Sequence, residues 1–314
     1  MARVILTQPL PRVDALAEAL RRRGHSVLPL PLSRIVAHGP DDAAGASALQ
    51  RLAAGAFDWA VFVSPTAIGA AARRLPPAWP AGTGIAVVGP GSRAALDLLP
   101  AGARIIAPDG PRFDAEALIE RPELRAAQGL RVLVLRGERG NDGWIEQLRR
   151  RGASVEVCAL YRREPVDPPP ALLARLADWL SAPRQDGSAG DRVVAEPAVA
   201  EPAPPALSLA DRLAAPFVVV TLVDSVQRLE RCLQRAFGGE AGVDAEGEGD
   251  GDAEGKGEGD GEGDGEGDRL TAAHGAPVLT IHPRIVQALQ AAGWRDVRLL
   301  QPGQQALAAA IESG

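Results

Sequence analysis

Two stretches of the chain share one pattern: RVILTQPLPRVDALAEALRRRGHSV at residues 3–27 and RVLVLRGERGNDGWIEQLRRRGASV at residues 131–155. Each begins with a short apolar run, passes through a turn into an amphipathic helical stretch, and reaches a second apolar run after a glycine. This order is typical of a βαβ unit, in which a helix connects two parallel strands. Because the two stretches align without a gap, they predict two similar domains.

The same alternation fills most of the remaining chain. Four further apolar runs are each followed by a turn and a helical stretch, which is the pattern of strands buried on both faces of a sheet; they lie at residues 60–63, 85–88, 217–220 and 278–281. The segments that follow residues 64 and 88 match those that follow 222 and 281, in the same order. We therefore expect an α/β protein of two similar parallel-sheet, flavodoxin-like domains.

Two segments of low complexity interrupt the second copy of this pattern. Residues 182–215 are rich in Ala, Pro and Glu, and residues 240–268 alternate glycine with acidic residues. Neither can bury enough apolar surface to offset chain entropy, so both are interpreted as loops or linkers. The acidic segment holds 13 acidic residues and one lysine, a charge of −12, whereas the whole chain carries −6. The rest is therefore mildly basic, at +6, which suits an anionic ligand.

Composition limits the possible classes of protein. Hydrophobic residues make up 46% and charged residues 24% of the 314 residues, which is the balance of a globular protein. There is no apolar run long enough for a membrane span and no secretory signal at the start. Two cysteines, Cys158 and Cys232, are too few for a disulfide framework or a zinc site. We expect a cytoplasmic, metal-free protein that binds neither membrane nor nucleic acid, since a basic stripe is also missing.

The loops at the ends of the predicted strands are candidates for ligand binding. In open parallel sheets, ligands collect where strands lead into helices, and the free amides at helix starts attract anions. These loops are rich in small, hydroxyl and glycine residues, with occasional arginine. If two such domains face one cleft, the loops suit a large ligand with many carboxylates or phosphates. The candidate binding residues are Thr7, Ser64, Thr66, Gly89, Gly91, Ser92, Arg136, Gly137, Thr221, Ser225, His282 and Arg284.

The common catalytic motifs are missing. The chain has no Gly-x-Gly-x-x-Gly turn, no Walker sequence and no Gly-x-Ser-x-Gly elbow. Its four histidines include no pair at metal-ligand spacing. Only His282 is expected on a ligand-facing loop, where it either stabilises a turn or takes part in catalysis.

Tyr161, the single tyrosine of the chain, follows an apolar run and precedes Arg162 and Arg163. A phenol at a strand end can donate a proton to a leaving group, and nearby arginines would favour the resulting anion. The alternative is a half-buried strand tyrosine with its hydroxyl in water. Both interpretations are open at this point.

Taken in order, several segments resemble the uroporphyrinogen-III synthase family: residues 3–9, 24–32, 62–68, 87–92, 133–138, 157–163, 281–285 and 292–294. Each match is weak alone, but together they cover nearly the whole chain outside the two low-complexity segments. The resemblance implies two α/β domains joined by two strands, near 30–36 and 160–165. It also implies a discontinuous first domain of residues 1–36 and 166–314, and a second domain of residues 37–165.

The resemblance further implies a function. In this family, a hydro-lyase without a cofactor cyclises the linear tetrapyrrole hydroxymethylbilane to uroporphyrinogen III, as a step of haem biosynthesis. By position, Tyr161 matches a tyrosine proposed to assist departure of the hydroxyl group. Ser64 and Ser92 match hydroxyl positions of one domain, and Thr221 matches one of the other. We expect a monomer that receives its substrate from the preceding enzyme of the pathway.

Some residues depart from the family pattern. Thr221 is followed by Leu222 where the family often has serine, and Val63 and Thr66 replace a threonine and an asparagine. These changes affect individual side-chain contacts more than the backbone amides. A non-catalytic two-lobed protein that binds a polycarboxylate is the alternative function.

Overall fold

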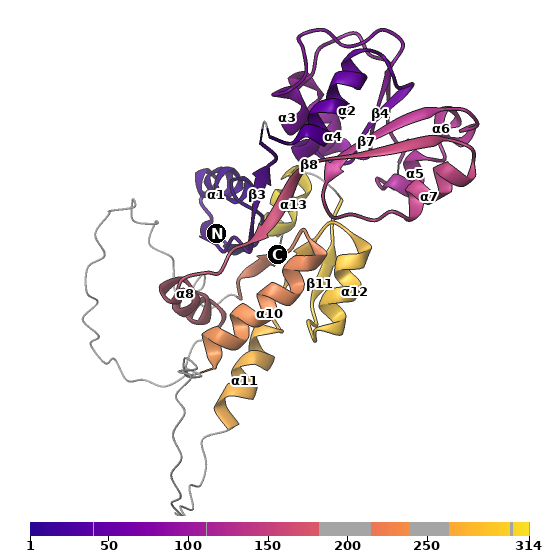
Figure 1. The fold of residues 1–314 in the computed structure, drawn as a ribbon. Helices are drawn as coiled ribbons and strands as arrows, with labels where there is room; N and C mark the ends of the chain where they lie inside the picture. Colours follow the sequence, from indigo (N-terminus) through magenta and orange to yellow (C-terminus); the bar gives the residue numbers. More distant parts are fainter. Residues whose placement is uncertain (40, 111, 182–214, 239–263, 302–303, 314) are drawn as a thin grey trace, which may run out of the picture. The chain divides into compact units, whose positions relative to one another are not determined.

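The structure is a computed structural model that describes residues 1–39, 41–110, 112–181, 215–238, 264–301 and 304–313 (Figure 1). Most of the two low-complexity segments lies outside these residues. The chain divides into two compact units. The first contains the described residues of 1–33, 165–301 and 305–314, and the second is formed by Arg34–Glu164. The chain passes from the first unit to the second between residues 33 and 34 and returns between residues 164 and 165.

The second unit contains a six-stranded sheet in the order β3-β8-β7-β4-β5-β6. Neighbouring strands from β8 to β6 are parallel. The bonds His38 N–H to Leu160 O and Val166 N–H to Leu32 O show that β3 runs antiparallel to β8. The strands are β3 (Ser33–Ala37), β4 (Trp59–Phe62), β5 (Gly84–Val87), β6 (Ile105–Ile106), β7 (Arg131–Gly137) and β8 (Ser154–Pro165).

Alternation along the strands of this unit supplies two cores, one on each face of the sheet. In β4, Ala60 and Phe62 pack into one core, while Trp59 and Val61 pack into the other. The first core is covered by α2 (Ala43–Ala53) and α3 (Pro65–Ala72), and the second by α5 (Ala115–Leu118), α6 (Pro122–Arg125) and α7 (Gly143–Arg150). The short α4 (Pro90–Ala94) and the 3-10 turn η1 (Leu96–Leu98) follow β5. Each large apolar side chain buried in this way contributes roughly 1.5–3 kcal/mol to folding.

The first unit contains a five-stranded parallel sheet in the order β11-β10-β9-β1-β2. Its strands are β1 (Arg3–Leu6), β2 (Ser26–Pro29), β9 (Phe217–Val219), β10 (Val278–Thr280) and β11 (Val297–Leu299). One face is covered by α8 (Pro170–Leu180), α10 (Val223–Phe237) and α12 (Pro283–Ala291), and the other by α1 (Arg12–Arg22) and α13 (Gln304–Ser313). Both faces of the sheet are therefore buried, as the apolar runs predict.

The strand orders show how the strands of the two sequence repeats are distributed between the two sheets. From β2 to β11, the first sheet has the order 2-1-3-4-5 of a flavodoxin-like fold. The second sheet, read from β8 to β6, has the same order if β7 is numbered as the first strand and β8 as the second. β4, β5 and β6 are then the third, fourth and fifth strands. The matched stretches even share one register, since Arg3 faces Ser26 and Arg131 faces Ser154. Each unit thus combines the first two strands of one repeat with the last three of the other.

Equivalent glycines end the helices of the two matched stretches. Gly24 follows α1 and Gly152 follows α7, with φ of +84° and +91°. Side chains rarely adopt this left-handed backbone, so glycine is favoured where the chain reverses into the next strand. The shared glycine of the repeat therefore has a local structural cause.

The acidic segment ends earlier than its composition suggests. We expected a loop up to residue 268, but α11 (Asp264–Ala273) already begins at 264. Its end is attached to α10, since Ala273 is buried and His274 Nε2 lies 2.9 Å from Glu230 Oε2. Trp294 Nε1 donates to the other oxygen of Glu230 at 2.7 Å. The carboxyl-terminal end of α11 is therefore packed against α10 by Ala273 and His274.

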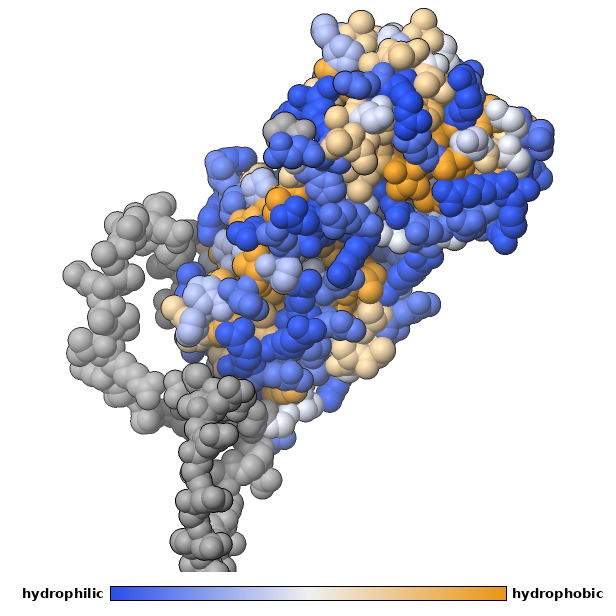
Figure 2. Space-filling view, in the orientation of Figure 1, coloured by the Kyte–Doolittle hydropathy of each residue, from blue (hydrophilic) through white to orange (hydrophobic). Residues whose placement is uncertain are grey.

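One face of the molecule is mainly polar. On the face shown in Figure 2, hydrophilic side chains predominate, with smaller groups of apolar ones between them. Across the described ranges, no helix combines the length and the apolar character that a membrane span requires. The same ranges contain no group of three or more His, Cys, Asp or Glu side chains that could hold a metal ion.

One buried thiol lies in the core of each unit. Cys158 packs in the second unit and Cys232 in the first, and both are free. Burial raises the pKa of each thiol to about 11. At pH 8 only about one thiol in a thousand is then ionised, and the thiolate is the reactive form.

We predict that both thiols react slowly with Ellman's reagent in the folded protein and rapidly in denaturant. In the single-thiol variants Cys232→Ala and Cys158→Ala, the remaining thiol reports the opening of one unit alone. Urea titration of the reaction rate measures this. Rapid reaction of either thiol without denaturant would contradict its place in the core.

Candidate functional site

Parallel pairing brings the carboxyl ends of β4, β5 and β7 to one edge of the second sheet. Phe62, at the end of β4, is paired with Val87 of β5 and with Leu135 of β7. Beyond these pairs follow Ser64, Gly89 and the end of β7. β8 extends past the same edge, where Tyr161 is paired with Gly137. The candidate residues of this unit therefore lie on adjacent strand ends.

Tyr161 is bonded to one of these strand ends. Its side chain is 2% exposed, and its hydroxyl lies 3.2 Å from Ser64 Oγ. The phenol is thus neither half-buried nor in contact with bulk water. Above the ring, the Cζ atom of Arg163 lies 5.7 Å from its centroid. This is the geometry of a cation–π contact between the guanidinium and the face of the ring.

Ser64 is fixed by the helix that it begins. It has extended backbone (φ −159°), and its Oγ accepts a hydrogen bond from Ala67 N–H at 3.1 Å, which makes it the N-cap of α3. Pro65 occupies the first helical position, where its missing N–H is not needed. Thr66 lies in the same first turn and is partly buried. The hydroxyl that meets Tyr161 is therefore held by a rigid element, and Ser64 is partly exposed.

The loop after β5 packs closely against its neighbours. A Cβ on Gly91 would lie 3.6 Å from Pro65 Cγ, and one on Gly89 would lie 3.6 Å from Phe113 Cβ. Ser92 is buried. The start of α4 therefore lies in ordinary van der Waals contact with Pro65, the residue that follows Ser64.

At the end of β7, the backbone of Gly137 lies so close to the Tyr161 ring that there is no space for a side chain. The β7–β8 register is irregular between Arg136 and Gly137, and a Cβ on Gly137 would lie 2.8–2.9 Å from the Tyr161 ring. No side chain fits there without displacing the ring. Arg136 is nearly buried and forms an ion pair with Asp142, the N-cap residue of α7. Its charge is thus already compensated within the loop.

The other five candidates lie at the corresponding edge of the first sheet. The Thr7 hydroxyl is buried and donates to Val219 O at 2.8 Å, so it holds β1 to β9. Ser225 is also buried, in the first turn of α10, and Thr221 just before it is partly buried. His282 is the N-cap of α12, where its Nδ1 accepts from Arg284 N–H at 3.1 Å. In this unit, Arg284 alone among the candidates is mainly exposed.

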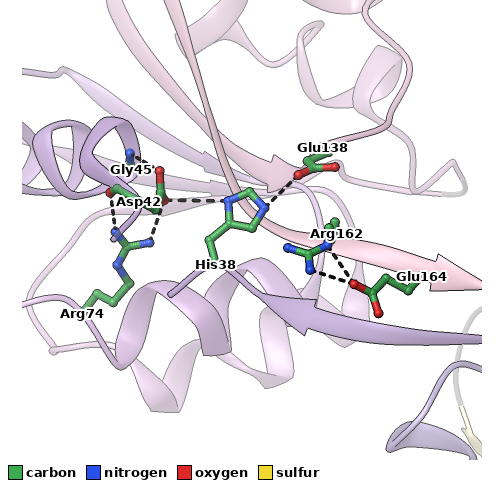
Figure 3. Close-up of polar contacts among 7 residues, drawn as sticks. All are labelled: His38, Asp42, Gly45, Arg74, Glu138, Arg162 and Glu164. Carbon is green, nitrogen blue, oxygen red and sulfur yellow. Dashed lines mark hydrogen bonds and ion pairs between the residues drawn. The ribbon is translucent and has the colours of Figure 1, made fainter. Parts of the chain in front are cut away.

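Sequence reasoning missed a chain of polar contacts that runs from Glu138 through His38 and Asp42 to Arg74 (Figure 3). The imidazole of His38 lies between two carboxylates: its Nε2 donates to Glu138 Oε1 at 3.0 Å, and its Nδ1 lies 3.7 Å from Asp42 Oδ2. The same Asp42 oxygen accepts from Arg74 Nη1 at 3.1 Å. The only local signal in the sequence is the four-residue spacing of His38 and Asp42, which is too common to be informative.

Asp42 is held as an anion by its own helix. Its Oδ1 accepts from Gly45 N–H at 2.9 Å, as the N-cap of α2. The Gly45 amide first, and then the Arg74 guanidinium, hold the pKa of Asp42 below its usual range. Next to this pair is a hollow of about 190 Å³, lined by Ala37, His38, Gly39, Ala70, Arg73, Arg74 and Leu160.

Comparison with known proteins identifies relatives of one kind. A family model described as uroporphyrinogen-III synthase HemD matches residues 14–182, more than half of the chain. The uroporphyrinogen-III synthase of Escherichia coli K12 is 29% identical over 163 residues, and that of Salmonella typhimurium LT2 is 32% identical over 161. Each alignment covers 51% of this chain and 64% of the relative, so the match spans less than two thirds of the relatives' length.

A solved structure supports the fold. The crystal structure of a mutant uroporphyrinogen III synthase from the extremely thermophilic bacterium Thermus thermophilus aligns with a TM-score of 0.51 and 15% identity. The alignment covers 100% of this chain and 98% of that one. At this identity the likeness bears on the fold and not on individual residues.

We predict that Gly137→Ala lowers the free energy of unfolding by about 1–3 kcal/mol, because the new methyl group overlaps the Tyr161 ring. Chemical denaturation measures the loss. Gly39→Ala is the control, since a Cβ there has no atom within 4 Å. In a Tyr161→Ala background the cost of Gly137→Ala should fall by more than half. An equal cost in both backgrounds would contradict the overlap.

Proposed function

This chain belongs to the uroporphyrinogen-III synthase family, and on that premise we propose that it cyclises hydroxymethylbilane to uroporphyrinogen III. The matched region covers only part of its curated relatives, so the activity is inferred from family membership together with the strand-end residues of the second unit. The Tyr161–Ser64 contact is the single observation that carries the proposal.

The proposed reaction requires few proton transfers. The substrate, a linear tetrapyrrole with eight carboxylates, loses its terminal hydroxyl group as water. The exposed carbon is then attacked by the last pyrrole, which is inverted through a spiro intermediate before the ring closes. One proton is needed by the departing hydroxyl, and one is released when the last pyrrole becomes aromatic again. The enzyme's main task is to hold the two chain ends in one geometry.

The contact between Tyr161 and Ser64 supports a proton donor for the first step. The phenol is buried, while Ser64 is partly exposed. In our proposal the phenol proton moves to Ser64 Oγ while the serine proton moves to the leaving hydroxyl. Arg163, near the ring, would stabilise the phenolate that forms. Because Ser64 is also fixed by Ala67 N–H, the donor is oriented before the substrate arrives.

The remaining strand-end residues are proposed to bind carboxylates. Thr66, Gly89 and Gly91 lie at the starts of α3 and α4. Ser92 is buried and Gly137 lies against the phenol ring, so these two would shape the site instead of binding carboxylates. In the first unit, Thr221, His282 and Arg284 lie at the starts of α10 and α12, where free amides attract anions. Thr7, Ser225 and Arg136 would act by shaping these loops, since their polar groups are buried. The monomeric state, the cytoplasmic setting and the transfer of substrate from the preceding enzyme stay predictions.

The direct test of the proposed function is product analysis. Purified protein is supplied with freshly generated hydroxymethylbilane, the product is oxidised to porphyrin, and the isomers are separated. We expect mainly the type III isomer. Mainly type I, which forms without catalysis, would contradict the proposal and favour a protein that binds a polycarboxylate without turning it over.

We predict that Tyr161→Phe lowers turnover tenfold or more, the usual range for loss of a general acid. The ring and its packing are kept, so only the proton donor is removed. Thr83→Val is the matched control: it removes a buried hydroxyl of the same unit, which donates to Phe57 O at 2.7 Å before β5. It should reduce stability by about 1 kcal/mol without reducing turnover. Equal turnover for Tyr161→Phe and wild type would assign the phenol a structural role.

A further inference from the structure

The side chain of His38 reaches across β8. Its main-chain N–H donates to Leu160 O at 2.9 Å, and its ring Nε2 donates to Glu138 Oε1 at 3.0 Å. His38 follows β3 on one side of β8, and Glu138 follows β7 on the other side. The ring therefore connects the two neighbours of β8 beside residues 160 and 161 (Figure 3).

Glu138, which the His38 ring contacts, is itself hydrogen-bonded to the main chain of Tyr161. The main-chain N–H of Glu138 donates to Tyr161 O at 3.0 Å. The carbonyl groups of Leu160 and Tyr161 are thus bonded to His38 and Glu138, the same two residues that the imidazole joins. A shift of Glu138 would loosen the bond to Tyr161 and move Gly137, which lies against the phenol ring. Two successive hydrogen bonds thus connect His38 to Tyr161 through Glu138.

The loop that carries Glu138 needs an anchor. Residues 138–142 are all exposed, and they follow the irregular β7–β8 register at Arg136/Gly137. Such a segment has few apolar contacts of its own and opens at low free-energy cost. The Arg136–Asp142 ion pair holds its far end, and the His38–Glu138 bond holds its near end, next to Tyr161.

The ring of His38 is itself held in place. Its side chain is only 16% exposed, compared with 49% for Glu138. On the opposite side, Asp42 faces Nδ1 at 3.7 Å and is fixed by Gly45 N–H and Arg74. A charged carboxylate on each side favours one orientation of the ring. The rigid partner in the bond is therefore His38, and Glu138 is the group that it holds.

We propose that His38 is a positioning residue for Tyr161: its imidazole holds Glu138, and with it the 138–142 loop, against β8, so that the phenol stays bonded to Ser64. The consequence for turnover rests on the proposed function. The positioning itself can be measured without substrate.

A spectroscopic test is available because Tyr161 is the only tyrosine of the chain. Ring-¹³C-labelled tyrosine gives the NMR signals of this residue alone. His38→Leu and, from the other end, Glu138→Ala should each shift and broaden these signals in the folded protein. His38→Gln, whose side-chain amide can donate to Glu138, should restore them. The control Glu156→Ala breaks the Arg51–Glu156 ion pair on the same strand and should leave the signals in place.

Turnover gives a second measurement. For His38→Leu we expect kcat to fall about 10- to 100-fold, the scale of a misplaced catalytic group, while KM changes less than about threefold. His38→Gln should recover most of kcat. A variant that only destabilised the fold would lower the melting temperature and leave kcat at lower temperature unchanged.

The possible results separate the two proposals. Tyr161 signals that do not move in His38→Leu and Glu138→Ala overturn the positioning role, and so do signals that move equally in His38→Gln. Moved signals with an unchanged kcat overturn its part in turnover. If the wild-type protein forms no type III product, the proposed function fails, and the NMR signals alone decide the positioning of Tyr161.

Discussion

Parallel strands with two apolar faces can be stable only when helices cover both sides, and this constraint organises the whole molecule. In the second unit, neighbouring residues of β4 alternate between two cores, so α2 and α3 must pack on one face and α5 to α7 on the other. Each helix returns the chain to the starting edge, and the parallel strands from β8 to β6 all end at the same opposite edge. Ser64, Gly137 and Tyr161 meet there as a result of this topology.

Much of the fold could be predicted from the sequence because it depends on local periodicity. Apolar runs and helical stretches give the strands, the helices and the two α/β domains, and the repeat of residues 3–27 at 131–155 gives their likeness. The repeat alone does not show that strands from different copies share a sheet. That pairing depends on contacts such as Val4 with Phe217, which are remote in sequence. Only the family resemblance indicated a discontinuous domain.

Less of the candidate site than of the fold could be predicted from the sequence. Strand-end position correctly places Ser64, Gly137 and Tyr161 near one another, since a parallel sheet aligns its ends. It does not show that Thr7 and Ser225 are buried, or that Arg136 is paired with Asp142. The His38–Glu138 bond was missed because its partners are 100 residues apart and neither belongs to a motif. Side-chain direction and burial, which decide these cases, are properties of tertiary packing.

The exchange of strand pairs between the two repeats has a consequence for biosynthesis. Residues 34–164 form one uninterrupted unit, so this unit can assemble while the ribosome is still adding the rest of the chain. Strand β1 leaves the ribosome well before its partner β9, which lies beyond residue 216. Until then Val4, Ile5 and Leu6 stay without the second neighbour that buries them. β1 is thus translated more than 200 residues before the strand that completes its place in the sheet.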